Sequence, residues 1–293
     1  MKKKRKMSKK QKTYLFIIIP VVLLFFMFNT WPMLNGFFYS FTNYKGYGSY
    51  DMVGFQNYID LFSDARVLKS YLFTFKYAIC GTILVNVLSL LMALALNAKI
   101  RCKSALRGIY FVPNILGGLI IGYIFSYIFT YIIPAIGQTW NIEWLQNSIL
   151  SSSAYAWIGV LIVGVWQAVA MTTIIYISGL QTVPGDVYEA SRIDGSSKWT
   201  EFWKITFPLI IPFVSINLVL TTKNFMMVFD QILSLTGGGP AQSTESISYL
   251  IYNNGLDGGQ FGFQSANAFI FFLVIVIFSI VQQNITSKKE EQL

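Results

Sequence analysis

The chain has 293 residues, of which 54% are apolar or aromatic and only 12% are charged, with a net charge of +9. Ordinary soluble domains carry roughly 25% charged residues, so this composition excludes a soluble globular protein and a disordered chain and places most of the sequence in lipid. Histidine is absent, which excludes a histidine-ligated metal, a histidine general base and a Ser-His-Asp triad from this chain.

Six segments are apolar enough to cross a bilayer, which takes about 20 residues of helix. The fifth is the weakest, because it contains Lys223 and Asp230. The first follows a lysine-rich start, but no small-residue cleavage site comes after it, which indicates an uncleaved anchor. The spans are predicted at residues 14–41, 70–97, 108–131, 154–180, 207–232 and 261–284. Between and around them lie a basic tail at 1–13, outer loops at 42–69, 132–153 and 233–260, inner segments at 98–107 and 181–206, and a tail at 285–293.

Basic residues are divided unequally between the two sides of this arrangement. Seventeen of the 22 Lys and Arg fall in the two tails and the two inner segments. Because cytoplasmic loops collect Lys and Arg, both termini are predicted to be cytoplasmic. The positive net charge is therefore a topology signal and does not indicate a nucleic-acid partner. Cys80 and Cys102 would lie about 33 Å apart on a helix, too far for a disulfide, and are interpreted as inert thiols.

Two outer loops carry patterns of their own. Phe55, Tyr58, Ile59 and Phe62 repeat at helical spacing, which predicts a short helix that either lies on the outer membrane interface or packs on neighbouring spans. Residues 235–240 read Leu-Thr-Gly-Gly-Gly-Pro. A phosphate-binding loop needs a Lys and a Ser or Thr at fixed offsets, which are missing here and elsewhere. The chain is therefore not expected to hydrolyse a nucleotide, and the glycines predict a flexible reversal.

The inner segment at 181–206 is the most informative stretch. Asp186 and Glu189 have the form of a capping box, so a short helix is predicted to begin there, and Gly195 is placed to end it. This helix exposes a small apolar face with charges beside it, which suits docking into a groove on another protein. The apolar face consists of Val187, Ala190 and Ile193.

A second helix is predicted directly after this one. Ser196 or Ser197 can cap it, and Trp199, Phe202 and Trp203 fall on one of its faces. The two helices together predict a helix–Gly–helix hairpin that projects from the membrane.

These residues resemble the EAA loop of ABC-importer permeases. The match comprises Glu189, Ala190, Gly195, Ile205 and Pro208, and the fuller carbohydrate-permease form adds Asp194 and Phe202. Ser191 and Ser196 replace alanine and Phe207 replaces leucine, all of them small or apolar exchanges. Residues 229–244 resemble the FDxxxxLTGGGPxxxT stretch of carbohydrate-type permeases similar to the first maltose-importer subunit, and residues 54–62 resemble that subfamily more loosely.

The resemblance implies an all-α membrane fold of six helices with a cytoplasmic coupling hairpin, as in type I importers, in a bacterial inner membrane. It implies a second permease, favouring a heterodimer, together with two cytoplasmic ATPases, an extracellular or periplasmic binding protein and a sugar substrate. ATP and Mg would be held by the ATPases, with no cofactor and no enzymatic activity on this chain. The residues implied to contact the ATPase are Val187, Glu189, Ala190, Ser191, Arg192, Ile193, Asp194 and Gly195.

Polar residues in the fifth span suggest a water-filled cavity, since ionisable groups inside a membrane are costly. On a continuous helix Lys223 and Asp230 would share a face about 10 Å apart along the axis. A cation there suggests an acidic saccharide. The candidates for cavity lining are Asn217, Thr221, Lys223, Asn224, Met227 and Gln231. A structural role is assigned to Asp230, Gly237, Gly238, Gly239 and Pro240, and helix–helix hydrogen bonds to Asn86, Gln167 and Asn267.

Other functions remain open at this point. The chain could be an ABC permease for another solute, such as a glycerol-phosphate-like compound. An ion-driven secondary transporter would predict inverted repeats, and none is clear. A membrane enzyme lacks histidine, a reactive cysteine context and paired intramembrane acids.

Overall fold

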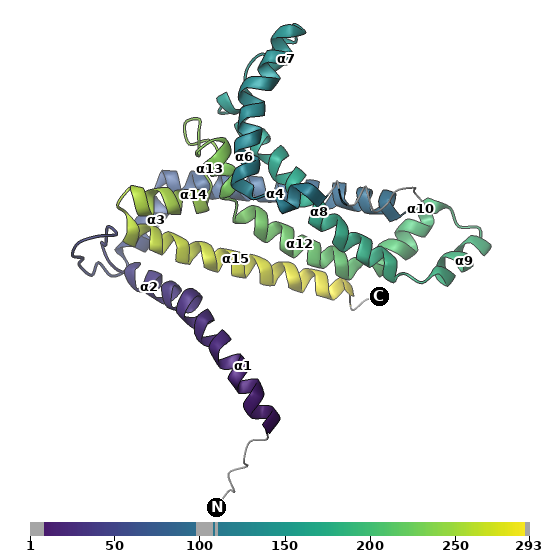
Figure 1. The fold of residues 1–293 in the computed structure, drawn as a ribbon, viewed down its shortest axis with the longest axis horizontal. Coiled ribbons are helices and arrows are strands. Elements are labelled where there is room, and N and C mark those ends of the chain that lie inside the picture. The colour runs from purple at the N-terminus through teal and green to yellow at the C-terminus, as the bar shows by residue number, and fades with distance from the viewer. Residues whose placement is uncertain (1–8, 98–107, 109–110, 291–293) are drawn as a thin grey trace, which may run out of the picture. The chain divides into compact units, whose positions relative to one another are not determined.

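The computed structural model describes residues 9–97, 108 and 111–290, which are largely helical, with one isolated bridge between Thr42 and Met52 and no strand in those ranges. The predicted all-helical fold is confirmed. Two compact units make up the chain. The first combines the residues up to Ser63 with Ile251–Ile270, and the second combines Asp64–Leu250 with the residues from Phe271 onward (Figure 1).

Five helical segments in the described ranges are long and apolar enough to cross a membrane, and a bent pair makes a sixth if it counts as one span. Two of them are the single helices α4 (Ala65–Asn97) and α8 (Ala156–Thr182). The other three apolar segments are Tyr14–Tyr39, Gly118–Thr139 and Phe261–Thr286. The bent pair is Lys198–Leu209 with Ile211–Met226, at 68° to each other. Pro208 and Pro212 flank this break, and a proline cannot donate to the helical ladder.

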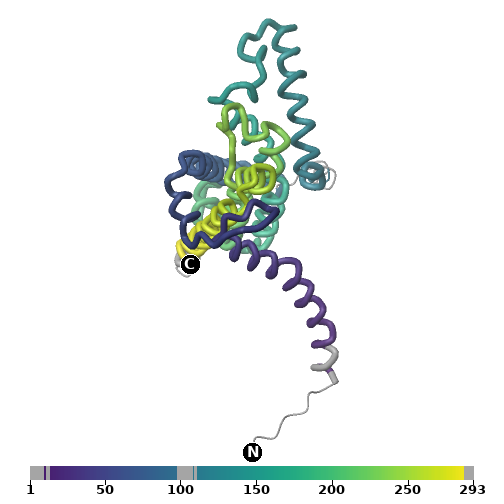
Figure 2. Tube along the Cα trace, turned by 90° about the vertical axis from the view of Figure 1, so that its left-hand side faces the viewer, coloured from purple at the N-terminus to yellow at the C-terminus, as the bar shows by residue number. Residues whose placement is uncertain are grey.

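Two helices take a different course from the straight spans expected at 108–131 and 207–232. The first is interrupted at Leu116 and Gly117, where Gly117 has extended backbone angles. The chain then continues across the direction of α4 and α8 (Figures 1 and 2) through α6 (Gly118–Tyr127), η2 (Ile128–Ile132) and α7 (Ile133–Thr139). The second, α12 (Ile211–Met226), ends before residue 232, and a separate helix α13 (Asp230–Leu235) follows it.

The first unit contains the N-terminal helical segment, an outer loop and the chain around Phe261. Its helices are α1 (Lys9–Phe25), η1 (Phe26–Thr30), α2 (Trp31–Tyr39), α3 (Gln56–Ser63), η6 (Asn253–Asp257) and the start of α15 (Phe261–Glu290). The loop is anchored by Asn57, whose Nδ2 donates to the carbonyl oxygens of Ser40 and Thr42 at 2.8 Å each. On the opposite side of α3, three apolar side chains are at least 60% exposed, which agrees with the interfacial alternative for this helix: Phe55, Ile59 and Phe62.

Close packing of α4, α8 and α12 forms the centre of the second unit. Glycines allow the approach, because a Cβ on Gly81 of α4 would overlap the ring of Phe225 on α12, and one on Gly164 of α8 would overlap Tyr77 on α4. Within lipid, helices associate through such small residues and through hydrogen bonds between helices. Asn86 supplies these, as its Nδ2 donates to Thr221 at 3.0 Å. The predicted helix–helix role of Asn86 is thus matched by its contacts.

One end of the second unit is held by a partly buried ion pair. Arg66, in the first turn of α4, contacts both carboxylate oxygens of Glu245, at 2.8 Å from Nε and 2.7 Å from Nη2. Glu245 is 2% exposed and precedes α14 (Ile247–Tyr252). Such a bidentate pair fixes the loop between α13 and α14 on the end of α4. Two single-turn elements complete this unit, η3 (Glu143–Leu145) and η4 (Ile149–Ser151).

Candidate functional site

The hairpin predicted at 181–206 consists of α9 (Gly185–Ile193) and α10 (Lys198–Glu201), which continues into η5 (Phe202–Thr206) and α11 (Phe207–Leu209). Figure 1 shows α9 and α10 beyond the ends of α8 and α12. The capping-box prediction is wrong, because Pro184 occupies the N-cap position and Asp186 lies inside the first turn without a capping hydrogen bond. There its negative charge still complements the positive end of the helix.

The turn between the two helices follows the sequence closely. Gly195 has φ +76°, and its N–H donates to the carbonyl of Arg192, while the N–H of Ser196 donates to that of Ser191, both at 3.1 Å. These two bonds form a Schellman motif, which favours glycine at the left-handed position. The side chain of Ser197 accepts from the Thr200 N–H at 3.2 Å and caps α10. Gly195 as the helix stop and serine as the second cap are therefore confirmed.

The outward side of α9 presents the apolar residues expected for docking. Ile193 is 86% exposed, Val187 is 37% exposed, and Ala190 is also exposed. Four of the predicted coupling residues line a groove of about 330 Å³ between α9 and the second helix: Val187, Ala190, Ser191 and Asp194. Glu189 is exposed, and Arg192 lies 3.6 Å from Glu201 across the hairpin. The candidates thus share one helix but are distributed over different faces of it.

The inward side of α9 is fixed to the membrane helices by Tyr188, a residue that the sequence pattern did not single out. Its ring packs on a buried cluster formed by the ends of α4 and α8 and the start of α12: Ala93, Leu96, Tyr176, Ile177, Leu180, Val183 and Ile210. Its hydroxyl lies 3.1 Å from the hydroxyl of Thr206. The only signal in the sequence is an aromatic residue opposite the exposed apolar face. Tyr188 therefore attaches α9 to the membrane helices through packing and a hydroxyl contact.

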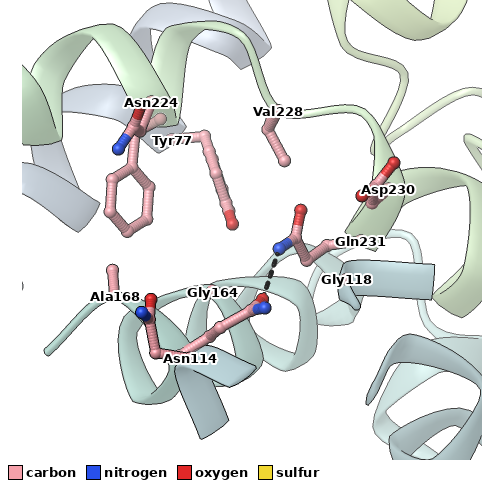
Figure 3. Close-up of a pocket in the computed structure, with 11 residues that line it drawn as sticks. Tyr77, Asn114, Gly118, Gly164, Ala168, Asn224, Val228, Asp230 and Gln231 are labelled. Atoms are coloured by element: carbon pink, nitrogen blue, oxygen red, sulfur yellow. Dashed lines mark hydrogen bonds between the residues drawn. The ribbon is translucent and has the colours of Figure 1, made fainter. Parts of the chain in front are cut away.

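A polar pocket of about 230 Å³ lies among α4, α8, α12 and α13, beside the break at Gly117 (Figure 3). Figure 3 shows Asn224, Gln231 and Asn114 reaching into it, with Nε2 of Gln231 donating to Gln167 at 2.8 Å. Gln167 in turn donates to the carbonyl of Leu116 at 3.2 Å. The lining residues are Tyr77, Asn114, Gly118, Gly164, Gln167, Ala168, Asn224, Phe225, Val228, Asp230 and Gln231.

The structure separates the predicted cavity residues. Asn224 and Gln231 line the pocket, whereas Lys223 and Met227 are exposed outside it. Asn217 and Thr221 are also outside this lining, being 1% and 4% exposed in the packing of α12 on α4 and α8. There Asn217 Nδ2 donates to the carbonyl of Thr172 at 3.2 Å and Thr221 accepts from Asn86. The expectation of one polar face lining a cavity is wrong for two reasons. Within α12, Asn217 and Thr221 are covered by α8 and α4. Beyond Met226 the helix ends, so a rotation counted along one helix does not carry across residues 227–229.

Asp230 is predicted to lie within the fifth span, but in the structure it begins a separate helix. It is the first residue of α13 and lies against Gly118, where a Cβ would come within 2.7 Å of its carboxylate oxygen. Gly118 begins α6, whose N-terminus carries partial positive charge, so the carboxylate is favourably placed. Because Asp230 also lines the pocket, its position supports both a structural role and contact with a bound molecule.

The glycine-rich loop is a hydrogen-bonded structure built around Thr244. Gly237 and Gly238 have φ +55° and +81°, and a Cβ on Gly238 would lie 2.9 Å from the ring of Tyr249. Thr244 is fully buried, and its hydroxyl contacts the Thr236 hydroxyl at 2.8 Å and the Gly239 carbonyl at 2.6 Å. Pro240 follows at the turn, and the Ser243 N–H donates to its carbonyl at 3.0 Å. These hydrogen bonds and the packing on Tyr249 hold the loop in one arrangement, which differs from the flexible reversal predicted from its glycines.

Of the two cysteines, Cys102 lies outside the described residues.

Comparison with known proteins gives consistent matches along the chain. A family model described as "Binding-protein-dependent transport system inner membrane component" matches residues 85–291. The multiple sugar-binding transport system permease protein MsmF of Streptococcus mutans is 38% identical over 289 residues, covering 98% of this chain and 99% of that protein. The probable starch degradation products transport system permease protein AmyD of Thermoanaerobacterium thermosulfurigenes is 33% identical, with both chains covered completely.

Among solved structures, a chain of a bacterial ABC transporter involved in the import of the acidic polysaccharide alginate superposes with a TM-score of 0.82 at 18% identity, covering 96% of each chain. This likeness establishes the fold. The family match over most of the sequence and the near-complete coverage of permease relatives lead to one conclusion. The chain belongs to the inner-membrane components of binding-protein-dependent ABC transport systems and is an integral-membrane transport subunit rather than an enzyme.

Proposed function

We propose that this permease carries a sugar or oligosaccharide into the cell. The support is the substrate class named for its relatives, which include the sugar-binding and starch-product permeases and the trehalose/maltose permease MalF of Thermococcus litoralis, 30% identical over 283 residues. The chain pairs with a second permease, in our proposal a different one, and receives substrate from a binding protein on the outer side. Both of its termini face the cytoplasm.

The energy comes from two cytoplasmic ATPase subunits that hold ATP and Mg. The observation that carries this proposal is α9, which exposes Val187, Ala190 and Ile193 on one side and is packed into the membrane bundle through Tyr188 on the other. A helix with an exposed apolar face is suited to a groove on a partner protein. When the ATPases close, they would move the hairpin and open the substrate cavity of the permease toward the outer side of the membrane. Hydrolysis of ATP would then return the permease to its starting state.

The polar pocket supports a neutral sugar. Its described lining offers amide and hydroxyl groups, with Asp230 as a carboxylate and no Lys or Arg among those residues. Hydroxyl-rich ligands are held by such a small set of donors and acceptors on an apolar frame. The acidic-saccharide hypothesis depended on Lys223, which is not among the lining residues, and a glycerol-phosphate-like anion would lack a cationic partner there for the same reason.

The docking proposal is tested with Ile193→Asp and a matched Ile193→Leu control. At the centre of an apolar interface the aspartate would be buried without a partner, which costs several kcal/mol, so co-purification of the ATPase should fall at least about tenfold. Ile193→Leu should retain it, and membrane abundance of both variants should be unchanged. Full ATPase association and sugar uptake by Ile193→Asp, or by a chain with residues 187–195 scrambled, would refute the proposal.

A further inference from the structure

A large open groove lies between the end of α4 and the second helix of the hairpin, and it shares no lining residue with the polar pocket. Its volume is about 810 Å³, and its lining is mostly apolar. We name it the α4–α10 groove. It is lined by Val87, Leu90, Leu91, Leu94, Asn97, Leu180, Tyr188, Arg192, Lys198, Trp199, Glu201, Phe202, Trp203 and Thr206.

One wall of the groove is a continuous apolar stripe on α4. Val87, Leu91 and Leu94 follow one another at helical spacing, and Leu91 is 58% exposed. From Val87 to Leu94 the stripe rises about 10 Å, against the roughly 15 Å of hydrocarbon in one leaflet of a bilayer. The stripe is therefore long enough to contact most of an acyl chain of a single leaflet.

Polar and aromatic groups of the hairpin line the groove together with this stripe. Arg192 and Lys198 lie on the hairpin there, beside Trp199 and Trp203, which are 72% and 45% exposed. Tryptophan side chains of this kind occupy the headgroup level of membranes. Glu201 also lines the groove, but its contact with Arg192 is long at 3.6 Å, and within the described residues no ion pair engages Lys198.

We propose that the α4–α10 groove binds an anionic phospholipid of the inner leaflet, with an acyl chain along the α4 stripe and its phosphate at Lys198 and Arg192. Basic pockets beside membrane helices on the cytoplasmic side select anionic headgroups. The proposal rests on the cytoplasmic placement of the hairpin given under the proposed function. A lipid in this groove touches both the bundle and the coupling hairpin, so it would stabilise the hairpin against the end of α4.

The experiment uses the complete importer reconstituted in nanodiscs of equal parts phosphatidylglycerol and phosphatidylcholine, then measures the phospholipid retained per complex by native mass spectrometry. Lys198→Gln removes a rim charge, and the matched control Lys204→Gln removes an exposed charge of the same hairpin outside the groove. Leu91→Trp fills the groove, and Leu72→Trp is its control on an exposed part of α4 far from it.

Lys198→Gln should weaken phosphatidylglycerol retention about fivefold, the effect of about 1 kcal/mol for one basic residue at an anionic headgroup. Leu91→Trp should weaken retention of both lipids, and the two controls should match the unchanged protein. Equal retention in all variants, or an equal loss for Lys198→Gln and Lys204→Gln, would overturn the proposal. A photo-crosslinker at position 91 that captures a protein chain in place of lipid would overturn it too. Because bound lipid is measured separately from ATPase association, failure of the docking proposal gives a different result.

Discussion

At the scale of single residues, the polar groups of the membrane helices divide into two kinds. Asn86, Asn217 and Thr221 make hydrogen bonds between helices and hold the bundle together. Asn224 and Gln231 face a pocket. A sequence pattern cannot separate the two kinds, because both satisfy the rule that a polar group within lipid needs a partner.

The pocket residues lead to a prediction for transport. Asn224→Ala should raise the sugar concentration needed for half-maximal uptake about tenfold, because one hydrogen bond to a bound ligand is worth about 1 kcal/mol and its unpaired partner adds to the loss. Leu220→Ala, on an exposed part of the same helix and outside the pocket, is the control. Radiolabelled-sugar uptake into vesicles measures both, and an unchanged half-saturation for Asn224→Ala would count against a substrate site here.

At the scale of elements, the turn of the hairpin and its attachment to the bundle are stabilised in different ways. Its turn is fixed locally by Gly195 and Ser197, and its attachment is fixed by Tyr188 and Thr206 through packing and a 3.1 Å hydroxyl contact. In our proposal, docking and transmission of motion are therefore carried by opposite faces of α9.

If docking and attachment use separate faces of α9, a substitution on one face should impair only the function of that face. Tyr188→Ala should keep its ATPase but lose coupling, because the outward face stays intact while a partly buried aromatic contact with the bundle is removed. The stability lost should be smaller than the roughly 3 kcal/mol of a fully buried aromatic side chain. Sugar uptake per ATP hydrolysed should fall about tenfold. Tyr188→Phe, which loses only the hydroxyl contact, should show a smaller fall. If ATPase binding and uptake fall together in Tyr188→Ala, the division of roles between the faces is wrong.

At the scale of the whole molecule, the sequence predicts an orientation, because 17 of the 22 Lys and Arg fall in the two tails and the two predicted inner segments, one of which contains the hairpin. The predicted outer loop of the first unit holds few of them and is closed by Asn57, with exposed apolar side chains at α3.

This orientation is testable by labelling in a background with Cys80→Ser and Cys102→Ser. Tyr47→Cys, in the outer loop and 74% exposed, should react with a membrane-impermeant maleimide in intact cells or spheroplasts. Ser196→Cys, in the hairpin turn, should react only after the membrane is opened, because the predicted topology places it in the cytoplasm. If Ser196→Cys reacted in intact cells and Tyr47→Cys only after the membrane was opened, the topology would be the reverse of the predicted one. The docking and lipid proposals would then both be wrong.

The sequence by itself determined the membrane class, the helical content and the turn of the hairpin, because hydropathy, helix periodicity and glycine conformation act within a few residues of chain. The resemblance of residues 189–208 and 229–244 also sufficed to predict the family, which the comparisons confirm. The sequence did not determine where α12 stops or how the third span bends, because those breaks depend on how α13 packs on α6 around Gly118 and Gly122. Which polar residues face a pocket, and that Tyr188 attaches the hairpin, were decided only by tertiary structure, since both are contacts between segments that are far apart along the chain.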